Sequence, residues 1–342
     1  MQKAKRVQVS FFDLIYDHSV PANHFLRKLN ESIDWNRFER HVEHLHASEK
    51  GRPAHNALLM TKTLILQFLY DLSDRQLEEQ IQDRISFRFF LGVDPADPIP
   101  DHTAYCRFRD RLGAETIAHL FNEVVKQARS KKLVKDRLCI VDATHVEAKV
   151  NTYRMNAEKK DDDSSDDPPS RIDPDARHGY KTKNKPFFGY KVAIGMDKSS
   201  SIITRVTATP GNEHDSTHFA TVADPAAKAV AADKGYDTPD NFTVLKKRKQ
   251  RAAIIVKRRK GKQRGHVNAR YPQRKDYQLY YRLKACRPLI EKIFGTAKQW
   301  YGLARAKYYG LKKMTMQAIL TMMAINFKRI ITLETCLQTS KK

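Results

Sequence analysis

Two isolated aspartates stand where short apolar strands are expected. Asp142 lies in "CIVDATHV", and Asp233 follows the apolar run "AVAA". In a strand, Ile140 and Asp142 would face one side and Val141 the other, and a carboxylate there is costly to bury without a partner. A single such acid is most simply explained by an ion pair with a Lys or Arg. Two of them in one predicted sheet favour a site for a hard cation such as Mg²⁺, which takes carboxylate, water and phosphate oxygens.

A third acid lies in "KACRPLIEKIFGTAKQW", which is expected to be helical. Arg287, Glu291 and Lys298 are spaced by four and seven residues, so they fall within roughly 40° of one another on one helical face. A Glu between two cations can also be an ordinary i,i+4 network, which contributes only about a few tenths of a kcal/mol. Alone, this helix is therefore weak evidence for a site, and it gains weight beside the two aspartates.

These motifs together resemble those of the DDE transposases of bacterial insertion sequences, specifically the insertion-sequence-five-type group. "IVDATHV" is similar to the motif of the first catalytic Asp, "AADKGYD" to that of the second, and "RPLIEKIFGTAK" to that of the Glu. "HGYKTKNKPFFGYKVAIGMD" and "TATPGNEHDS" resemble the strands between them, and residues 51–113 resemble the group's N-terminal domain. One position departs from the family pattern, since Lys284 stands where a Tyr is common three residues before the Arg.

The resemblance implies a ribonuclease-H-like fold in which Asp142, Asp233 and Glu291 are catalytic and bind metal. It implies two Mg²⁺ ions as cofactors, for which Mn²⁺ could substitute, about 3.5–4 Å apart and holding the attacking and leaving oxygens of an in-line displacement. The implied function is a transposase that binds the inverted-repeat ends of its mobile element and catalyses DNA strand cleavage and strand transfer. Its expected partners are double-stranded DNA, at element ends and target, and a second protomer in a homodimer on DNA.

The charge of the chain independently indicates a polyanionic partner. The net charge is +24, from 63 Lys or Arg against 39 Asp or Glu, and nucleic acid is the simplest partner for such an excess. Residues 246–275 hold fourteen Lys or Arg and no acid. The helix expected from Asp101 carries three arginines, which are equally well explained as a solvated face. The expected DNA contacts are Arg287, Lys298, Lys234, Lys246, Lys247, Arg248, Lys257, Arg258, Arg259, Lys260, Arg107, Arg109 and Arg111.

The pattern of elements predicts two domains. Residues 1–135 are predicted to form an all-α domain for DNA binding and assembly, and residues 136–335 an α/β catalytic domain. In the second, strands predicted near 137–150, 187–197, 201–215, 229–233 and 251–257 would form a mixed five-stranded sheet flanked by helices. The acidic, Ser- and Pro-rich stretch 154–176 is expected to be a disordered insertion, and 246–275 a basic DNA-contacting segment.

Several smaller features are predicted along the chain. Ser73 and Gln76 have the spacing of a capping box, and Pro239 suits the first turn of a helix. The chain is expected to turn between two strands at 198–200. Asp215 is expected to cap the helix that follows it. A helix is predicted from about Tyr277 to beyond Trp300, followed by a last apolar helix.

Composition limits the cellular compartments and the classes of function that are expected for the chain. No window holds eighteen uninterrupted apolar residues, the start lacks a secretory signal, and the four cysteines suggest neither zinc nor disulfides. A bacterial cytoplasmic protein, nucleoid-associated when bound to DNA, is expected. Two alternatives stay open: a ribonuclease-H-like nuclease without strand transfer, and a catalytically inactive DNA-binding repressor derived from a transposase. The presence of all three acids argues against the second.

Overall fold

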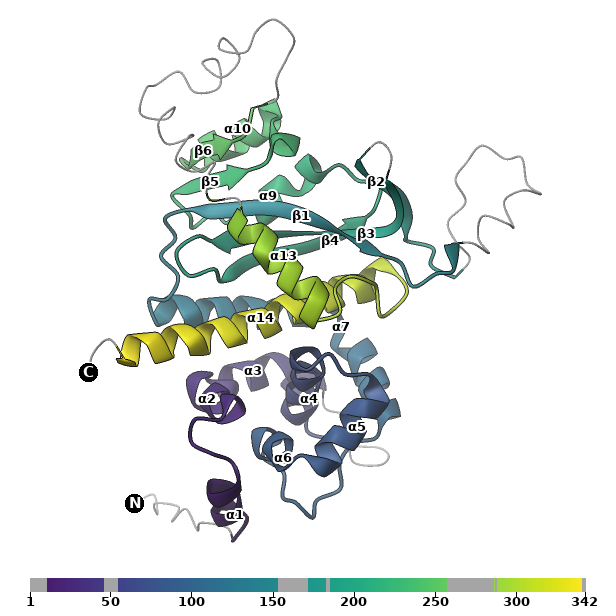
Figure 1. Cartoon of the computed structure of the whole chain (residues 1–342), viewed down its shortest axis with the longest axis vertical. Helices are drawn as coiled ribbons and strands as arrows, with labels where there is room; N and C mark the ends of the chain where they lie inside the picture. Colours follow the sequence, from purple (N-terminus) through teal and green to yellow (C-terminus); the bar gives the residue numbers. More distant parts are fainter. Residues whose placement is uncertain are drawn as a thin grey trace, which may run out of the picture. The chain divides into compact units, whose positions relative to one another are not determined.

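The computed structural model describes residues 11–45, 55–152, 172–182, 185–256, 286 and 288–339. The chain forms two compact units, an N-terminal unit that ends at Leu112 and a C-terminal unit that begins at Gly113 (Figure 1). The boundary falls inside helix α7 (His102–Ser130), where Gly113 leaves the helical conformation with φ 68° and ψ 165°. It therefore lies earlier than the expected boundary at residue 135, because the second half of α7 packs with the C-terminal unit.

The N-terminal unit is helical, as predicted. Helix α4 (Ala57–Leu69) is its centre, since every residue from Met60 to Leu69 is buried, and a helix that is covered on all sides must lie inside a bundle. The predicted capping box is confirmed: the Ser73 hydroxyl accepts from the Gln76 amide, and the Gln76 side chain accepts from the Ser73 amide. The other helices are α1 (Phe11–Ser19), α2 (Phe25–Ser32), α3 (Trp35–Val42), η1 (Glu43–Leu45), α5 (Asp74–Asp83), α6 (Ile85–Leu91) and the first half of α7.

The C-terminal unit is built on a mixed sheet. Its strands are β1 (Cys139–Glu147), β2 (Arg177–Thr182), β3 (Lys185–Asp197), β4 (Ile203–Pro210), β5 (Ala229–Ala232) and β6 (Arg251–Ile254). The order is β2-β3-β1-β5-β6, with β4 also paired to β3. β3 is antiparallel to β1, β2 and β4, whereas β1, β5 and β6 are mutually parallel. This arrangement confirms the ribonuclease-H-like fold, with six described strands where five were expected.

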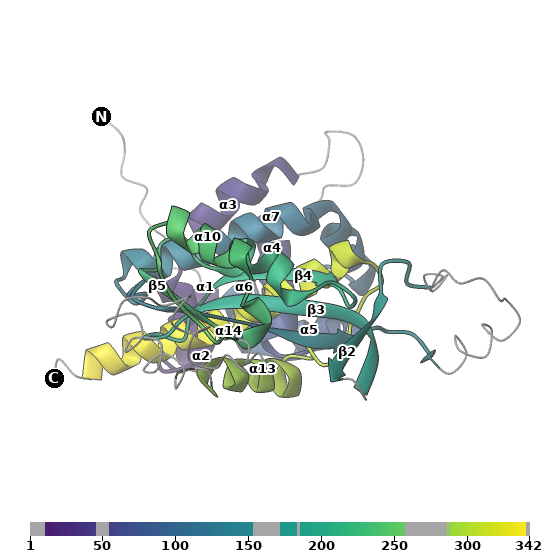
Figure 2. The same cartoon turned by 90° about the horizontal axis from the view of Figure 1, so that it is seen from above.

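Helices cover both faces of the sheet (Figures 1 and 2). On one face, α9 (Phe219–Val222) packs on β3 and β4, and α10 (Pro239–Lys247) packs on β6. On the other face, α13 (Pro288–Trp300) packs on β1, and α14 (Leu311–Thr339) packs on β3 and β4. The predicted first-turn proline of α10 is confirmed, with Thr238 as its N-cap. β3 and β4 are joined through 198–202, around the expected turn.

Two expectations about segment ends were wrong. Helix α13 ends at Trp300 and does not continue, because the chain turns there and Gly302 adopts a φ of 64°. The end of the acidic stretch is ordered: Asp173 is fully buried and accepts from the Tyr190 hydroxyl and the Gly310 amide, and Asp175 accepts from the Leu311 amide. The rest of the predicted insertion, from 154 to 171, lies outside the described residues.

None of the helices within the described ranges is long and apolar enough to cross a membrane.

Candidate active site

Asp142 and Asp233 lie at the same level of two adjacent parallel strands. Val141 of β1 is paired with Ala232 of β5, and each aspartate is the next residue of its chain segment. Asp142 is still within β1. Asp233 continues beyond β5 in an extended conformation, with φ −71° and ψ 169°. The pairing therefore brings the two acids side by side.

Both aspartates face the same side of the sheet. Val141 and Ala232, which precede them, are buried in the cluster that contains residues of α9 and α10. Because side chains alternate along a strand, Asp142 and Asp233 project toward the opposite face. That face is the one on which α13 packs against β1 (Figure 1).

The two carboxylates are held in the same way by their own main chain. Asp142 Oδ1 accepts from the Ala143 amide at 2.9 Å, and Asp233 Oδ1 accepts from the Lys234 amide at 2.6 Å. Both residues are half-buried. Asp233 also caps η4 (Lys234–Tyr236), a short turn that leads the chain away from the sheet. A hydrogen bond from the next amide fixes each carboxylate against its strand end.

Glu291 lies on the neighbouring helix, in the first turn of α13, and is exposed. Lys298 is two turns further along and half-buried, while Arg287 lies outside the described residues. Among the residues that can be described, no three His, Cys, Asp or Glu side chains are close enough together to hold a metal ion. The fold thus brings two of the three predicted acids together and sets the third on the helix that packs beside them.

Two domain families match the chain. The first, described as a transposase domain (DUF772), matches residues 14–111. The second, described as a transposase DDE domain, matches residues 134–327, which is more than half of the chain. The chain belongs to the DDE transposase family. This agrees with the insertion-sequence-five-type resemblance of its motifs, and it identifies the protein as a transposase.

Two solved structures are similar to the chain. One is the piggyBac transposase synaptic complex with hairpin DNA, with 9% sequence identity, a TM-score of 0.39, and coverage of 91% of this chain and 74% of the other. The second is the Mos1 transposase paired-end complex with left transposon end, with 11% identity, a TM-score of 0.19, and coverage of 84% of this chain and 82% of the other.

Several predicted DNA contacts of the transposase have exposed side chains. Lys234 follows Asp233 directly, and Lys246 and Lys247 form the last turn of α10; all three are exposed. Arg248 differs, because its guanidinium donates at 2.8 Å to Ala220 O within α9 and at 2.8 Å to Ala223 O just after it. Arg248 therefore has a structural role, whether or not it also contacts DNA. Lys257, Arg258, Arg259 and Lys260 lie outside the described residues.

Arg109 was wrongly predicted to contact DNA. Its residue is 2% exposed, and its two terminal nitrogens bond both carboxylate oxygens of Asp74 at 3.0 and 2.7 Å and the Gln67 side chain at 3.0 Å. A guanidinium used in this way inside a helical bundle cannot reach a phosphate. Arg107 and Arg111, on the same helix, are exposed, so the three arginines do not share one face.

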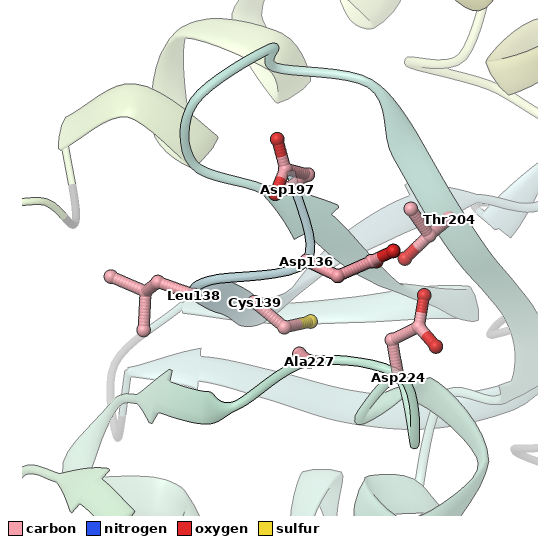
Figure 3. Close-up of a pocket in the computed structure, with 7 residues that line it drawn as sticks. All are labelled: Asp136, Leu138, Cys139, Asp197, Thr204, Asp224 and Ala227. Atoms are coloured by element: carbon pink, nitrogen blue, oxygen red, sulfur yellow. The ribbon is translucent and has the colours of Figure 1, made fainter. Parts of the chain in front are cut away.

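A second group of acids lines a small pocket near the start of β1. Figure 3 shows Asp136, Thr204 and Asp224 converging, whereas Asp197 points away. Arg129 satisfies this group, bonding Asp136 at 2.8 Å and Asp224 at 2.6 Å. Burial opposes the ionisation of Asp224, but bonds from Thr204 and the Ala226 amide and the charge of Arg129 hold its pKa below the ordinary value. The group is an ion-pair network and not a ligand set.

The segment "GNEHDS" also differs from its prediction. The cap of η3 (Asp215–His218) is the His214 side chain, which accepts from the Ser216 amide. Asp215 instead pairs with Lys191 of β3 at 3.0 Å. Sequence reasoning missed this pair because the two residues are brought together only by the pairing of β3 with β4.

Proposed function

We propose that this transposase cuts and joins DNA at the ends of its mobile element, with Asp142, Asp233 and Glu291 as its metal ligands. The observation that carries the proposal is the pairing of Val141 with Ala232, after which both parallel strands continue into an aspartate. Like charges on adjacent strands repel, and a bound cation would relieve that repulsion. The helix with Glu291 packs on β1, on the face toward which both acids project.

The chemistry of these donors fits Mg²⁺, with two ions as the expected number. Carboxylate oxygens are hard ligands of the kind that Mg²⁺ takes together with water and phosphate oxygens. The bound metal would stabilise the attacking and leaving oxygens of phosphoryl transfer. The nucleophile would be water when the end is nicked and the freed 3′-hydroxyl during strand transfer, so the chain need supply none. The Cys139 thiol, beside β5, is not an alternative nucleophile, because burial raises its pKa to about 12.

The DNA would be held by lysines and arginines, some of which lie on the same segments as the acids. Lys234 and Lys298 lie on the segments that carry Asp233 and Glu291, and Arg287 precedes that Glu by four residues. Lys246 and Lys247 are exposed on α10, and Arg107 and Arg111 on the N-terminal unit. Contacts of this kind position DNA without reading its sequence. A homodimer on two element ends and a cytoplasmic, nucleoid-associated location remain predictions.

The test compares three single variants on labelled inverted-repeat ends. Asp142→Asn and Asp233→Asn are expected to reduce cleavage by more than the roughly 10–100-fold that changes outside the ligand shell cost, while end binding without divalent metal stays close to that of the wild type. Asp240→Asn, which changes an exposed acid of α10, is the matched control and should cleave normally. Retained cleavage in Asp233→Asn would show that the assignment of the acids is wrong.

The products distinguish the alternatives. Hydrolysed ends together with a joined product are expected from a transposase. Hydrolysed ends alone would support the nuclease without strand transfer. Binding without either product would support the inactive repressor. Sedimentation of the protein with element ends then reports whether two protomers assemble on DNA.

A further inference from the structure

Two large aromatic side chains are exposed at the ends of the connection between α13 and α14. Trp300, at the end of α13, is 65% exposed, and Tyr309, just before α14, is 44% exposed. Between them, Tyr301, Leu303 and Ala306 are buried. Some apolar side chains of the connection are therefore buried, while two aromatic ones remain exposed to solvent. An exposed Trp does not contribute the favourable free energy that its burial would provide.

The connection is held rigidly against the end of β1. The Glu147 amide donates to Ala304 O, the Ala306 amide donates to Glu147 O at 2.7 Å, and Glu147 forms an isolated parallel bridge with Arg305. Gln317 of α14, fully buried, bonds three main-chain groups of the connection. These bonds join the main chain of the connection to the end of β1 and to α14, so the backbone that carries the exposed side chains is held in place.

The two exposed aromatic residues lie in a basic stretch of the chain. Residues 300–313 contain four Lys or Arg and no acid, and Lys312 is exposed. The Lys149 ammonium lies 5.7 Å from the centre of the Tyr309 ring. Described acids near the connection include Glu147, which is exposed, and Asp173 and Asp175, which both accept hydrogen bonds from main-chain amides.

The distance from the candidate acids suits a continuous DNA ligand. Glu147 lies five residues beyond Asp142 on β1, about 17 Å at the rise of a strand. Trp300 lies nine residues beyond Glu291 on α13, about 14 Å at the rise of a helix. Either path corresponds to roughly four or five base-pair steps of about 3.4 Å. Either distance therefore places this connection within reach of a duplex whose end is bound at the acids.

We propose that Lys149, Trp300, Tyr309, Lys312 and Lys313, together called the loop surface, bind the DNA that continues from the active site. The lysines contact phosphates, and the two rings pack on bases or sugars, which aromatic side chains do without reading sequence. This inference rests on the proposed function, because it takes its ligand to be the same DNA that the three acids act on.

The two tryptophans of the chain provide a direct test. The chain contains two Trp, and Trp35 is in the core of the N-terminal unit, 9% exposed. Trp35→Phe therefore leaves Trp300 as the single tryptophan, and Trp300→Phe leaves Trp35, so excitation selective for tryptophan reports on one site at a time. Titration with a duplex element end, without divalent metal, is expected to quench the emission of Trp300 and to leave that of Trp35 unchanged. Binding seen by anisotropy without quenching of Trp300 would overturn the inference.

Charge variants test the binding of phosphates by the lysines. In Lys312→Ala/Lys313→Ala, the slope of log K against log salt for end binding should fall by about 1.8, at about 0.9 for each phosphate that the protein no longer neutralises. The matched control is Lys135→Ala/Lys198→Ala, two exposed lysines near the opposite end of β1, with an expected change near zero. An equal fall in both double variants would mean a diffuse charge effect and would overturn the loop surface.

The proposed function and the loop surface fail in different ways. Asp233→Asn, made in the Trp35→Phe background, should lose cleavage and still quench on DNA. If the wild type cleaves element ends but Trp300 is not quenched, DNA binding by the loop surface is refuted, whereas the proposed function of the acids is supported. If Trp300 is quenched but the wild type yields no cleaved product, DNA binding by the loop surface is supported and the proposed function is refuted.

Discussion

Lys62 is a lysine inside the helical bundle whose ammonium is hydrogen-bonded, although burying its charge is unfavourable. It is 9% exposed on the central helix α4, and its ammonium donates to Asn30 Oδ1 at 3.0 Å and to Phe90 O at 3.1 Å. It also lies 4.6 Å from the centre of the Trp35 ring. Burial nevertheless lowers its pKa from 10.5 to about 8, so the folded unit prefers the neutral amine more than the unfolded chain does.

The sign of the pH dependence follows from that shift. Below about pH 8 Lys62 is charged in both states, and the burial cost is present in full. As the pH rises from about 8 to 10.5 the folded state loses its proton first, so the free energy of unfolding should rise, by at most about 3 kcal/mol. Lys62→Met should lack this rise. Denaturation followed by Trp35 emission in a Trp300→Phe background measures it, with Lys126→Met as the exposed control; an identical pH dependence in both would contradict the prediction.

At the scale of elements, Arg129 links the second half of α7 to two segments that flank the sheet. Arg129 bonds Asp136 before β1 and Asp224 after α9, and Asp224 is 1% exposed. Removing a partner from a buried ion pair leaves a charge without compensation, which typically costs about 3–5 kcal/mol. Arg205, at 3.9 Å from Asp224, remains, so the lower end of that range is expected for Arg129→Met.

That loss should depend on pH. The lowered pKa of Asp224 means that its contribution is present above the unfolded pKa, near 4, and is lost as the pH falls through the lower folded value. The difference between wild type and Arg129→Met should therefore be large at pH 7 and shrink toward pH 3. Denaturant unfolding at several pH values measures it, with the exposed Arg137→Met as control. Asp224→Asn should restore part of the stability of Arg129→Met, and a strictly additive double variant would argue against the coupling.

Most strands of the sheet could be predicted from the sequence, whereas the contacts between them could not. β1, β3, β4, β5 and β6 have apolar residues in long runs or in alternation, and those patterns located them. β2 has the sequence "RHGYKT", which carries no apolar alternation, so only its pairing with β3 reveals it. The acids could be chosen from their setting in the motifs, whereas the pairing of Val141 with Ala232 is a long-range contact that no local pattern encodes. Arg109 was misassigned because charge alone does not say which face of a helix is buried.

At the scale of the whole molecule, the two units are covalently joined through a helix that is interrupted at one residue. Gly113 has φ 68° and ψ 165°, a backbone region that residues with a side chain almost never adopt. No atom lies within 4 Å of a Cβ added there, so the obstacle is the backbone conformation and not the space. An L-residue at this position must either accept the strain or let the helix run on.

Gly113→Ala is therefore expected to lower the free energy of unfolding by about 1–3 kcal/mol. Gly295→Ala is the matched control, because Gly295 lies within α13 and a Cβ there also meets nothing within 4 Å. In an ordinary helical conformation alanine should stabilise by roughly 0.5–1 kcal/mol, since it restricts the unfolded chain. Chemical denaturation of the two variants should thus give shifts of opposite sign. If Gly113→Ala proves as stable as Gly295→Ala, the helix has run on through residue 113, and the cleavage assay on element ends then reports whether the transposase needs the interruption.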